Sequence, residues 1–181
     1  MSDQALGKKL AEEVELGLFL EAYELATHRA LSAVQSSENP DFICSQSNGE
    51  LTGLELTKVM RRHDIARWQR IYDRQNEMMP YDMLMEIQTL IERKEEARRA
   101  RYSARIAQTM LVLQLVDGSL NILGQFLDGL NEEFKDHGFA EIWLADYSGV
   151  EAYGDIELFG LFPGKWWGHH RRRWPDRKPY G

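Results

Sequence analysis

The chain has 181 residues, of which 43% are apolar and 28% are charged. This composition is typical of a folded globular protein and excludes a largely disordered chain. The single cysteine, Cys44, excludes a disulfide framework and a cysteine-based zinc site, and the longest apolar stretch, residues 110–116, is too short to span a bilayer. We therefore expect residues 1–181 to form one soluble cytoplasmic domain that is not exported and has no membrane partner.

The net charge of −7 argues against indiscriminate binding to polyanions. The charge is unevenly distributed, however, because residues 58–74 contain six basic and two acidic residues, and residues 165–181 contain six basic and one acidic residue. Such patches can meet a phosphate backbone, although a solvated charged surface is the commoner explanation of either one.

Apolar residues at helical spacing predict a first helix over residues 6–32. Its buried face is expected to contain Leu16, Phe19, Leu20 and Tyr23. Glu12 falls on the same face, one turn before these residues. An exposed or snorkelling carboxylate is the commoner explanation of such a position, and a functional carboxylate is the alternative.

The rest of the chain predicts an α/β fold. The expected elements are a β-hairpin over 41–58, a charged amphipathic stretch over 59–79, a helix over 81–105, a buried strand over 110–116, a helix over 119–136, and strands over 141–147 and 156–162. The strand at 110–116 is continuously apolar apart from Gln114, as is typical of a strand covered on both faces. This order implies a mixed central sheet with helices packed against it.

The hairpin is indicated by Asn48-Gly49, the strongest short hairpin signal, between two apolar runs. Centring the turn on Asn48 pairs Asp41 with Glu55, and centring it one position later shifts the pairing by one residue. Directly opposed carboxylates are destabilising unless a cation lies between them. A hard cation such as Mg²⁺ would turn this repulsion into attraction, whereas a solvated pair at the open end of the hairpin is the alternative.

Pro-Asp ending at Asp41 on one strand, followed by Glu-x-Thr from Glu55 to Thr57 on the next, resembles the PD-(D/E)xK restriction-endonuclease-like superfamily. The order of the expected elements also resembles that family, since an acidic helix precedes this motif and a long helix leading to an apolar strand follows it. The resemblance covers residues 6–116 and makes the remaining third a C-terminal α/β extension. It implies that Asp41 and Glu55 bind one or two divalent metal ions, with Glu12 as the carboxylate that some members add.

Thr57 stands where the motif has a lysine. Strand alternation puts Glu55 and Thr57 on one face and Lys58 on the other, so Lys58 cannot replace that lysine in an undistorted strand. The very-short-patch mismatch endonucleases resemble this chain in having threonine there, which implies that Thr57 acts near the metal. His63 could then act as a general acid or base, or Lys94 could supply the displaced cation. An exposed histidine and a solvated helix lysine are the commoner explanations of those two residues.

The C-terminal segment 165–181 is a tail that interleaves aromatic and basic residues, among them Arg171, Arg172, Arg173 and Trp174. Such side chains can stack on bases and neutralise phosphates, so these four are candidates for binding nucleic acid. The alternative is a tail that packs on its own domain, with tryptophans inward and arginines outward.

The sequence therefore predicts a nuclease that hydrolyses phosphodiester bonds of DNA or RNA, with Mg²⁺ or Mn²⁺ as cofactor and DNA as the expected partner. Cys44 lies in an apolar strand, and the chain has neither a Gly-x-Ser-x-Gly serine nor a glycine-rich phosphate loop. A catalytically inactive nuclease-like module that binds nucleic acid or a protein is the alternative, favoured by the missing lysine and the acidic net charge. A structural dimer unrelated to nucleic acid is a third reading, and the enzyme itself could form a homodimer.

Overall fold

In the part of the chain that the structure describes, one helix is followed by three consecutive strands, and helical segments and strands alternate after them. The computed structural model describes residues 3–60, 78–101, 106, 108–116, 118–128, 130–135 and 137–170. The elements are α1 (Asp3–Thr27), β1 (Leu31–Ser36), β2 (Phe42–Gln46), β3 (Leu51–Val59), α3 (Pro80–Arg101), β4 (Gln108–Leu115), α4 (Leu120–Leu127), β5 (Glu141–Asp146), α5 (Val150–Tyr153), β6 (Glu157–Phe162), the 3₁₀ turn η1 (Gly164–Trp166) and β7 (Gly168–His170).

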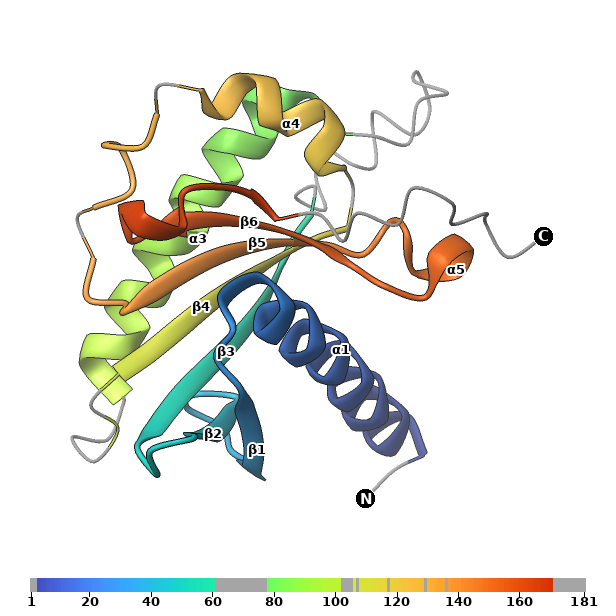
Figure 1. Cartoon of the computed structure of the whole chain (residues 1–181), viewed down its shortest axis with the longest axis vertical. Helices are drawn as coiled ribbons and strands as arrows, with labels where there is room; N and C mark the ends of the chain where they lie inside the picture. The colour runs from blue at the N-terminus through green and yellow to red at the C-terminus, as the bar shows by residue number, and fades with distance from the viewer. Residues whose placement is uncertain are drawn as a thin grey trace.

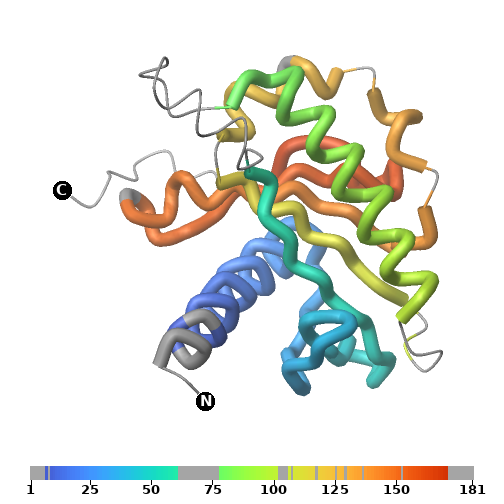
Figure 2. Tube along the Cα trace, turned by 180° about the vertical axis from the view of Figure 1, so that it is seen from behind, coloured from blue at the N-terminus to red at the C-terminus, as the bar shows by residue number. Residues whose placement is uncertain are grey.

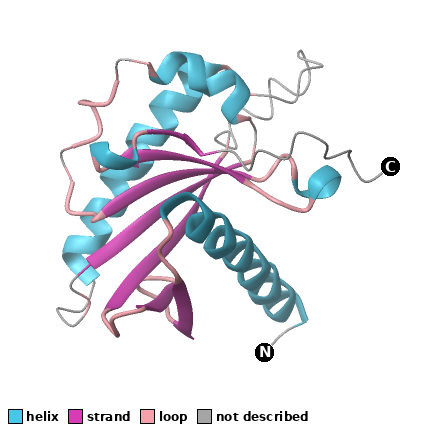
Figure 3. Ribbon diagram, viewed as in Figure 1, coloured by secondary structure: helices cyan, strands magenta, loops and turns pink. Residues whose placement is uncertain are grey.

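The described strands form one seven-stranded mixed sheet whose spatial order follows the sequence from β1 to β7 (Figure 1). Strands β3, β4 and β5 are parallel to one another, and every other neighbouring pair of strands is antiparallel. Parallel neighbours need a crossover connection, and α3 and α4 lie in the two crossovers here. Figure 3 shows the strands as one layer with helices packed against it. The predicted α/β class with a helix-flanked mixed sheet is therefore confirmed.

Side-chain alternation along β4 divides the buried apolar residues into two cores. Leu111 and Leu113 pack with α3 and α4, whereas Met110 and Val112 pack with α1. Figures 1 and 2, viewed from opposite sides, show α1 on one face of the sheet and α3 and α4 on the other. Gln114 follows the same alternation and faces α1. The candidate site described below lies where β3 meets both of these layers.

Several predicted elements are confirmed, with changed ends. The turn residue Gly49 has φ 84°, and its N–H donates to the Gln46 carbonyl, which closes the predicted hairpin turn. The predicted apolar face of α1 is buried at Leu16, Phe19 and Tyr23. The strands predicted over 110–116, 141–147 and 156–162 correspond to β4, β5 and β6.

The predicted end of the first helix at residue 32 was wrong. The helix stops at Thr27, because His28 takes a left-handed conformation with φ 57°, and residues 31–36 then form the unpredicted edge strand β1. The helix predicted over 119–136 ends at Leu127, since the next residue, Asp128, leaves the helical conformation at ψ 122°. The short strand β7 was also unpredicted.

Within the described residues, no helix is both long enough and apolar enough to cross a membrane.

Candidate functional site

The pairing of β2 with β3 brings Asp41 and Glu55 to facing positions. Phe42 pairs with Leu54 and Cys44 pairs with Thr52, which is the first of the two predicted registers. Asp41 directly precedes Phe42, and Glu55 directly follows Leu54. The ladder between the two strands ends at Phe42 and Leu54, so the two carboxylates stand just beyond the last paired residues.

Asp41 lies at the edge of β3 that β2 no longer covers. One oxygen of its carboxylate, Oδ2, accepts a hydrogen bond of 2.8 Å from the backbone N–H of Leu56. The pKa of Asp41 is raised to about 6, mainly by burial and next by the nearby carboxylate of Glu55, with a smaller contribution from Glu12. The Leu56 N–H and the Lys94 ammonium act in the opposite direction. Asp41 is therefore a carboxyl group in an environment that disfavours its charge.

Glu55 points to the opposite side of β3 from Leu54 and is only 6% exposed. Its Oε1 forms an ion pair with Nζ of Lys94, which reaches it from α3. The Lys94 side chain is 21% exposed. The structure thus brings Asp41, Glu55 and Lys94 close to one another, and Lys94 is paired with a carboxylate instead of being a solvated helix lysine.

Thr57 is buried, at 8% exposure, one alternation beyond Glu55 on β3. Lys58 points to the other side of the strand, where its Nζ lies 3.1 Å from Oε1 of Glu15 on α1. Gln114 of β4 donates to the second oxygen of Glu15 at 3.0 Å. The prediction that Lys58 and Glu55 occupy opposite faces is confirmed, and Lys58 belongs to a polar cluster with α1.

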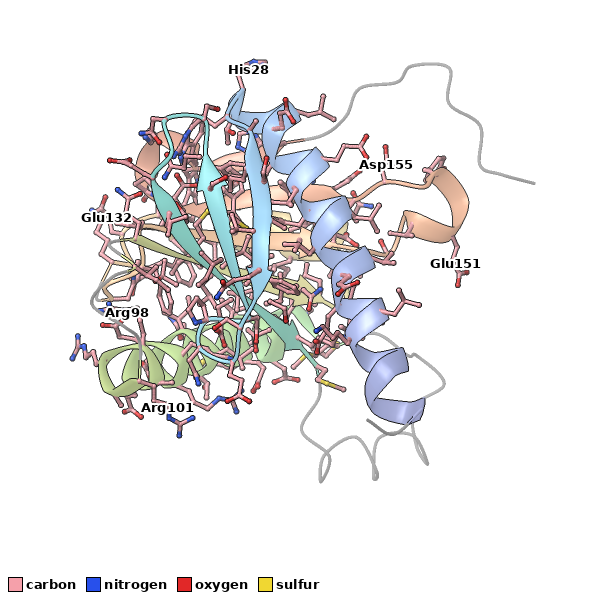
Figure 4. The ribbon with its side chains drawn as sticks, turned by 90° about the horizontal axis from the view of Figure 1, so that it is seen from below. His28, Arg98, Arg101, Glu132, Glu151 and Asp155 are labelled. Atoms are coloured by element: carbon pink, nitrogen blue, oxygen red, sulfur yellow. The ribbon has the colours of Figure 1, made fainter. Side chains whose placement is uncertain are left out.

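A cavity of about 310 Å³ opens beside Asp41, between α1 and the uncovered edge of β3. Its polar lining consists of Glu12, Glu15, Asp41, Thr57, Lys58 and Gln114. Figure 4 shows α1 beside the strands of the hairpin, and Arg98 and Arg101 toward the C-terminal end of α3. Glu12 therefore lines the same cavity as Asp41 and Thr57.

The donor chemistry of Asp41 and Glu55 fits a hard divalent cation. Mg²⁺ is commonly bound through one or two carboxylates, with water completing its shell. The described residues contain no group of three or more His, Cys, Asp or Glu side chains placed to bind a metal ion. An ion at this site would therefore depend on the two facing carboxylates and on water, with Glu12 approaching from the cavity.

Other predicted site residues lie outside the described part of the chain. These are His63, Arg171, Arg172, Arg173 and Trp174. The described beginning of the C-terminal segment packs onto the protein: η1 and β7 lie against β6, and Trp166 and Trp167 contact the two apolar cores.

Sequence reasoning missed Glu15 and the role of Gly53 at this site. Glu15 follows Glu12 by three residues on α1, a spacing that places both on adjacent turns of one helix face. Gly53 of β3 lies against Pro40, since a Cβ added at Gly53 would be 2.6 Å from Cγ of that proline. The glycine therefore makes room for the residue that precedes Asp41.

No protein-family model matches the chain, and neither a curated protein nor a solved structure is significantly similar to it.

Proposed function

We propose that this protein is a metal-dependent nuclease that hydrolyses phosphodiester bonds of DNA or RNA, with Asp41 and Glu55 as the ligands of Mg²⁺ or Mn²⁺. The observation that carries the proposal is the register of the hairpin. It sets the carboxylates of Asp41 and Glu55 opposite each other, and Asp41 has a raised pKa and lines a polar cavity.

The order of elements around these residues supports a restriction-endonuclease-like core. An acidic helix, α1, precedes the hairpin that carries Asp41 and Glu55, and the helix α3 leads from it to the buried parallel strand β4. This is the order on which the resemblance to the PD-(D/E)xK superfamily rests. The elements that follow β4, from α4 to β7, then belong to the C-terminal extension.

Different residues of this chain would have different roles in the reaction. Asp41 and Glu55 would bind the ion, and the Leu56 N–H fixes the orientation of the Asp41 carboxylate. A divalent ion supplies a bound water of lowered pKa and neutralises charge on the phosphoryl oxygens. Thr57 lines the cavity beside Asp41, where its hydroxyl or backbone can orient the attacking water.

A nuclease-like module without catalytic activity is the second candidate function. The specific observation in its favour is that Thr57 replaces the motif lysine while Lys94 is already paired with Glu55. Such a module would bind nucleic acid or a protein partner and would leave phosphodiester bonds intact.

The test is an incubation of purified protein with plasmid, single-stranded DNA and RNA, each with Mg²⁺, with Mn²⁺ and with EDTA. The variants are Asp41→Asn and Glu55→Gln, which keep side-chain size and remove charge. The control is Glu132→Gln, because Glu132 is an exposed carboxylate between α4 and β5 that pairs with Lys135 and does not line the cavity.

Cleavage that requires the metal, is lost in both site variants and persists in the control is the expected result. Binding that weakens with salt, without cleavage under any condition, would instead establish the inactive module. Cleavage that persists in Asp41→Asn and Glu55→Gln would refute the assignment of the site.

A further inference from the structure

A positive charge already contacts one of the two proposed metal ligands. The ammonium of Lys94 forms an ion pair with Oε1 of Glu55, whose side chain is only 7% exposed. The same ammonium acts favourably on the charge of Asp41. It is therefore a cation that offsets part of the repulsion between the carboxylates of Asp41 and Glu55.

We propose, on the basis of the proposed metal site, that Lys94 is a resident cation that a divalent ion must displace from Glu55. The lysine and the ion would then occupy the site alternately. Lys94 thereby sets the threshold of metal concentration at which the site becomes loaded.

Two physical arguments support this exchange. Burying a carboxylate is costly unless a positive charge compensates it, and Lys94 supplies such a charge to Glu55. A divalent ion and an ammonium that share one carboxylate oxygen repel each other at short range, where such repulsion is weakly screened.

The lysine side chain is also suited to leave. It has a flexible four-carbon stem and a compact, strongly hydrated charge, and it is 21% exposed in its paired position. The ammonium can therefore move toward water once another cation neutralises Glu55. An arginine would be held more firmly by a carboxylate, because its planar group can donate two parallel hydrogen bonds.

The first experiment measures Mn²⁺ binding by titration calorimetry at pH 7.5 for the wild-type protein and three variants. Lys94→Gln removes the charge and keeps a hydrogen-bond donor, and Lys94→Arg keeps the charge. Lys135→Gln is the matched control, because Lys135 also pairs with a glutamate, Glu132, but on a surface connection. We expect Lys94→Gln to bind Mn²⁺ about tenfold more tightly or better, Lys94→Arg to bind no more tightly than wild type, and the control to be unchanged.

The second experiment uses the wild-type protein alone, so it does not depend on the folding of a variant. Lysines are labelled briefly with acetic anhydride, with and without Mg²⁺, and the modification at each site is measured by mass spectrometry. We expect Mg²⁺ to increase labelling of Lys94 severalfold, because release from Glu55 exposes the amine. Lys135 pairs with Glu132, does not line the cavity beside Asp41, and serves as the internal control.

The two ideas fail in different ways. If wild-type protein binds Mn²⁺ and cleaves nucleic acid, but Lys94→Gln binds the ion no more tightly and labelling of Lys94 does not rise, the displacement is wrong and the nuclease stands. If neither wild-type protein nor Lys94→Gln binds Mn²⁺, both the metal site and the displacement are wrong. Tighter binding by Lys94→Gln supports the displacement even when no substrate is cleaved.

Discussion

Replacing Asp41 with asparagine is expected to stabilise the protein at neutral pH. Asparagine has nearly the same size, and its Oδ1 can still accept the hydrogen bond from the Leu56 N–H that Asp41 accepts at 2.8 Å. The substitution removes the negative charge that faces Glu55. Most substitutions of a part-buried, hydrogen-bonded residue destabilise a protein, so the expected sign is diagnostic of the local electrostatics.

The magnitude follows from the pKa of Asp41, which is about 6 in the folded protein against an ordinary value of 3.8. An acid whose pKa is raised by folding binds more protons in the folded state than in the unfolded state between these two values. Stability contributed by Asp41 is therefore highest below pH 4 and falls as the pH rises through 6. The difference corresponds to about 3 kcal/mol, and solvent screening at this part-buried position makes it an upper value.

We therefore expect Asp41→Asn to raise the free energy of unfolding by up to about 3 kcal/mol at pH 8 and to leave it nearly unchanged at pH 3.5. Urea denaturation at both pH values measures the two differences. Added Mg²⁺ should stabilise wild-type protein and not Asp41→Asn, because only the former keeps both ligands. A destabilised variant at pH 8, or the same difference at both pH values, would refute this reasoning.

The pKa of Glu95 is shifted in the opposite direction from that of Asp41, so the two acids should affect stability oppositely as the pH changes. Hydrogen bonds from Arg98, above all, and from Arg99 hold its pKa at about 2 against an ordinary value of 4.5. Its stabilising contribution is present above pH 4.5 and is lost as the pH falls toward 2. Glu95→Gln should accordingly lower the free energy of unfolding by up to about 3 kcal/mol at pH 8, with the difference shrinking on acidification.

Further predictions concern the support of the site and the core. Gly53→Ala should destabilise the protein by about 1–3 kcal/mol in urea denaturation and reduce any nuclease activity, because its methyl group would displace Pro40 beside the Asp41 carboxylate. Gly17→Ala, in α1 with open space around its Cα, should instead stabilise by about 0.5–1 kcal/mol, and a loss of stability there would contradict the helix assignment. Tyr23→Phe should lower the free energy of unfolding by about 1–2 kcal/mol, because the buried Glu141 loses the hydroxyl that donates to it at 3.1 Å. An unchanged midpoint of urea denaturation would show that this hydrogen bond contributes little.

Much of the fold could be predicted because its signals are local. The Asn48-Gly49 turn sets the register of the hairpin, so the positions of Asp41 and Glu55 follow by counting along two short strands. The strand β4 is recognisable from its continuous apolar run. In each case a few neighbouring residues determine the structure.

The missed elements lack such signals. All side chains of β1 after Leu31 are exposed, so this strand shows neither a buried face nor an alternating pattern. The helix α4 ends where the chain turns away at Asp128, although apolar residues at helical spacing continue to Leu130. The strand β7 has three residues and is defined by its pairing with β6.

The positions of the proposed ligands in the candidate site were predictable, whereas the residues that contact them were predictable only in part. The motif placed Asp41, Glu55 and Thr57, because their spacing is fixed by strand geometry. Lys94 was one of three alternatives for the absent motif lysine, beside Thr57 and His63. Its contact with Glu55 joins residues 39 positions apart and is not fixed by local spacing. The contact of Lys58 with Glu15 depends likewise on how α1 packs across the sheet, which no local pattern specifies.

Two other buried acids in the protein, Glu141 and Asp146, each accept hydrogen bonds from several donors. Glu141 accepts hydrogen bonds from the Tyr23 hydroxyl, the Trp143 indole and Arg29, and Asp146 accepts from two backbone N–H groups. In both cases the donors offset the loss of hydration of a buried carboxylate.

Asp41 differs from these acids because its pKa is raised and another carboxylate faces it. The fold therefore places an unfavourable charge beside a cavity, at a position where asparagine would serve the same backbone hydrogen bond. A divalent cation between Asp41 and Glu55 would supply the missing positive charge and make the arrangement favourable. Lys94 supplies one positive charge to Glu55 for the same electrostatic reason. The response of stability to Mg²⁺ is therefore the most direct test of whether this site binds a divalent ion.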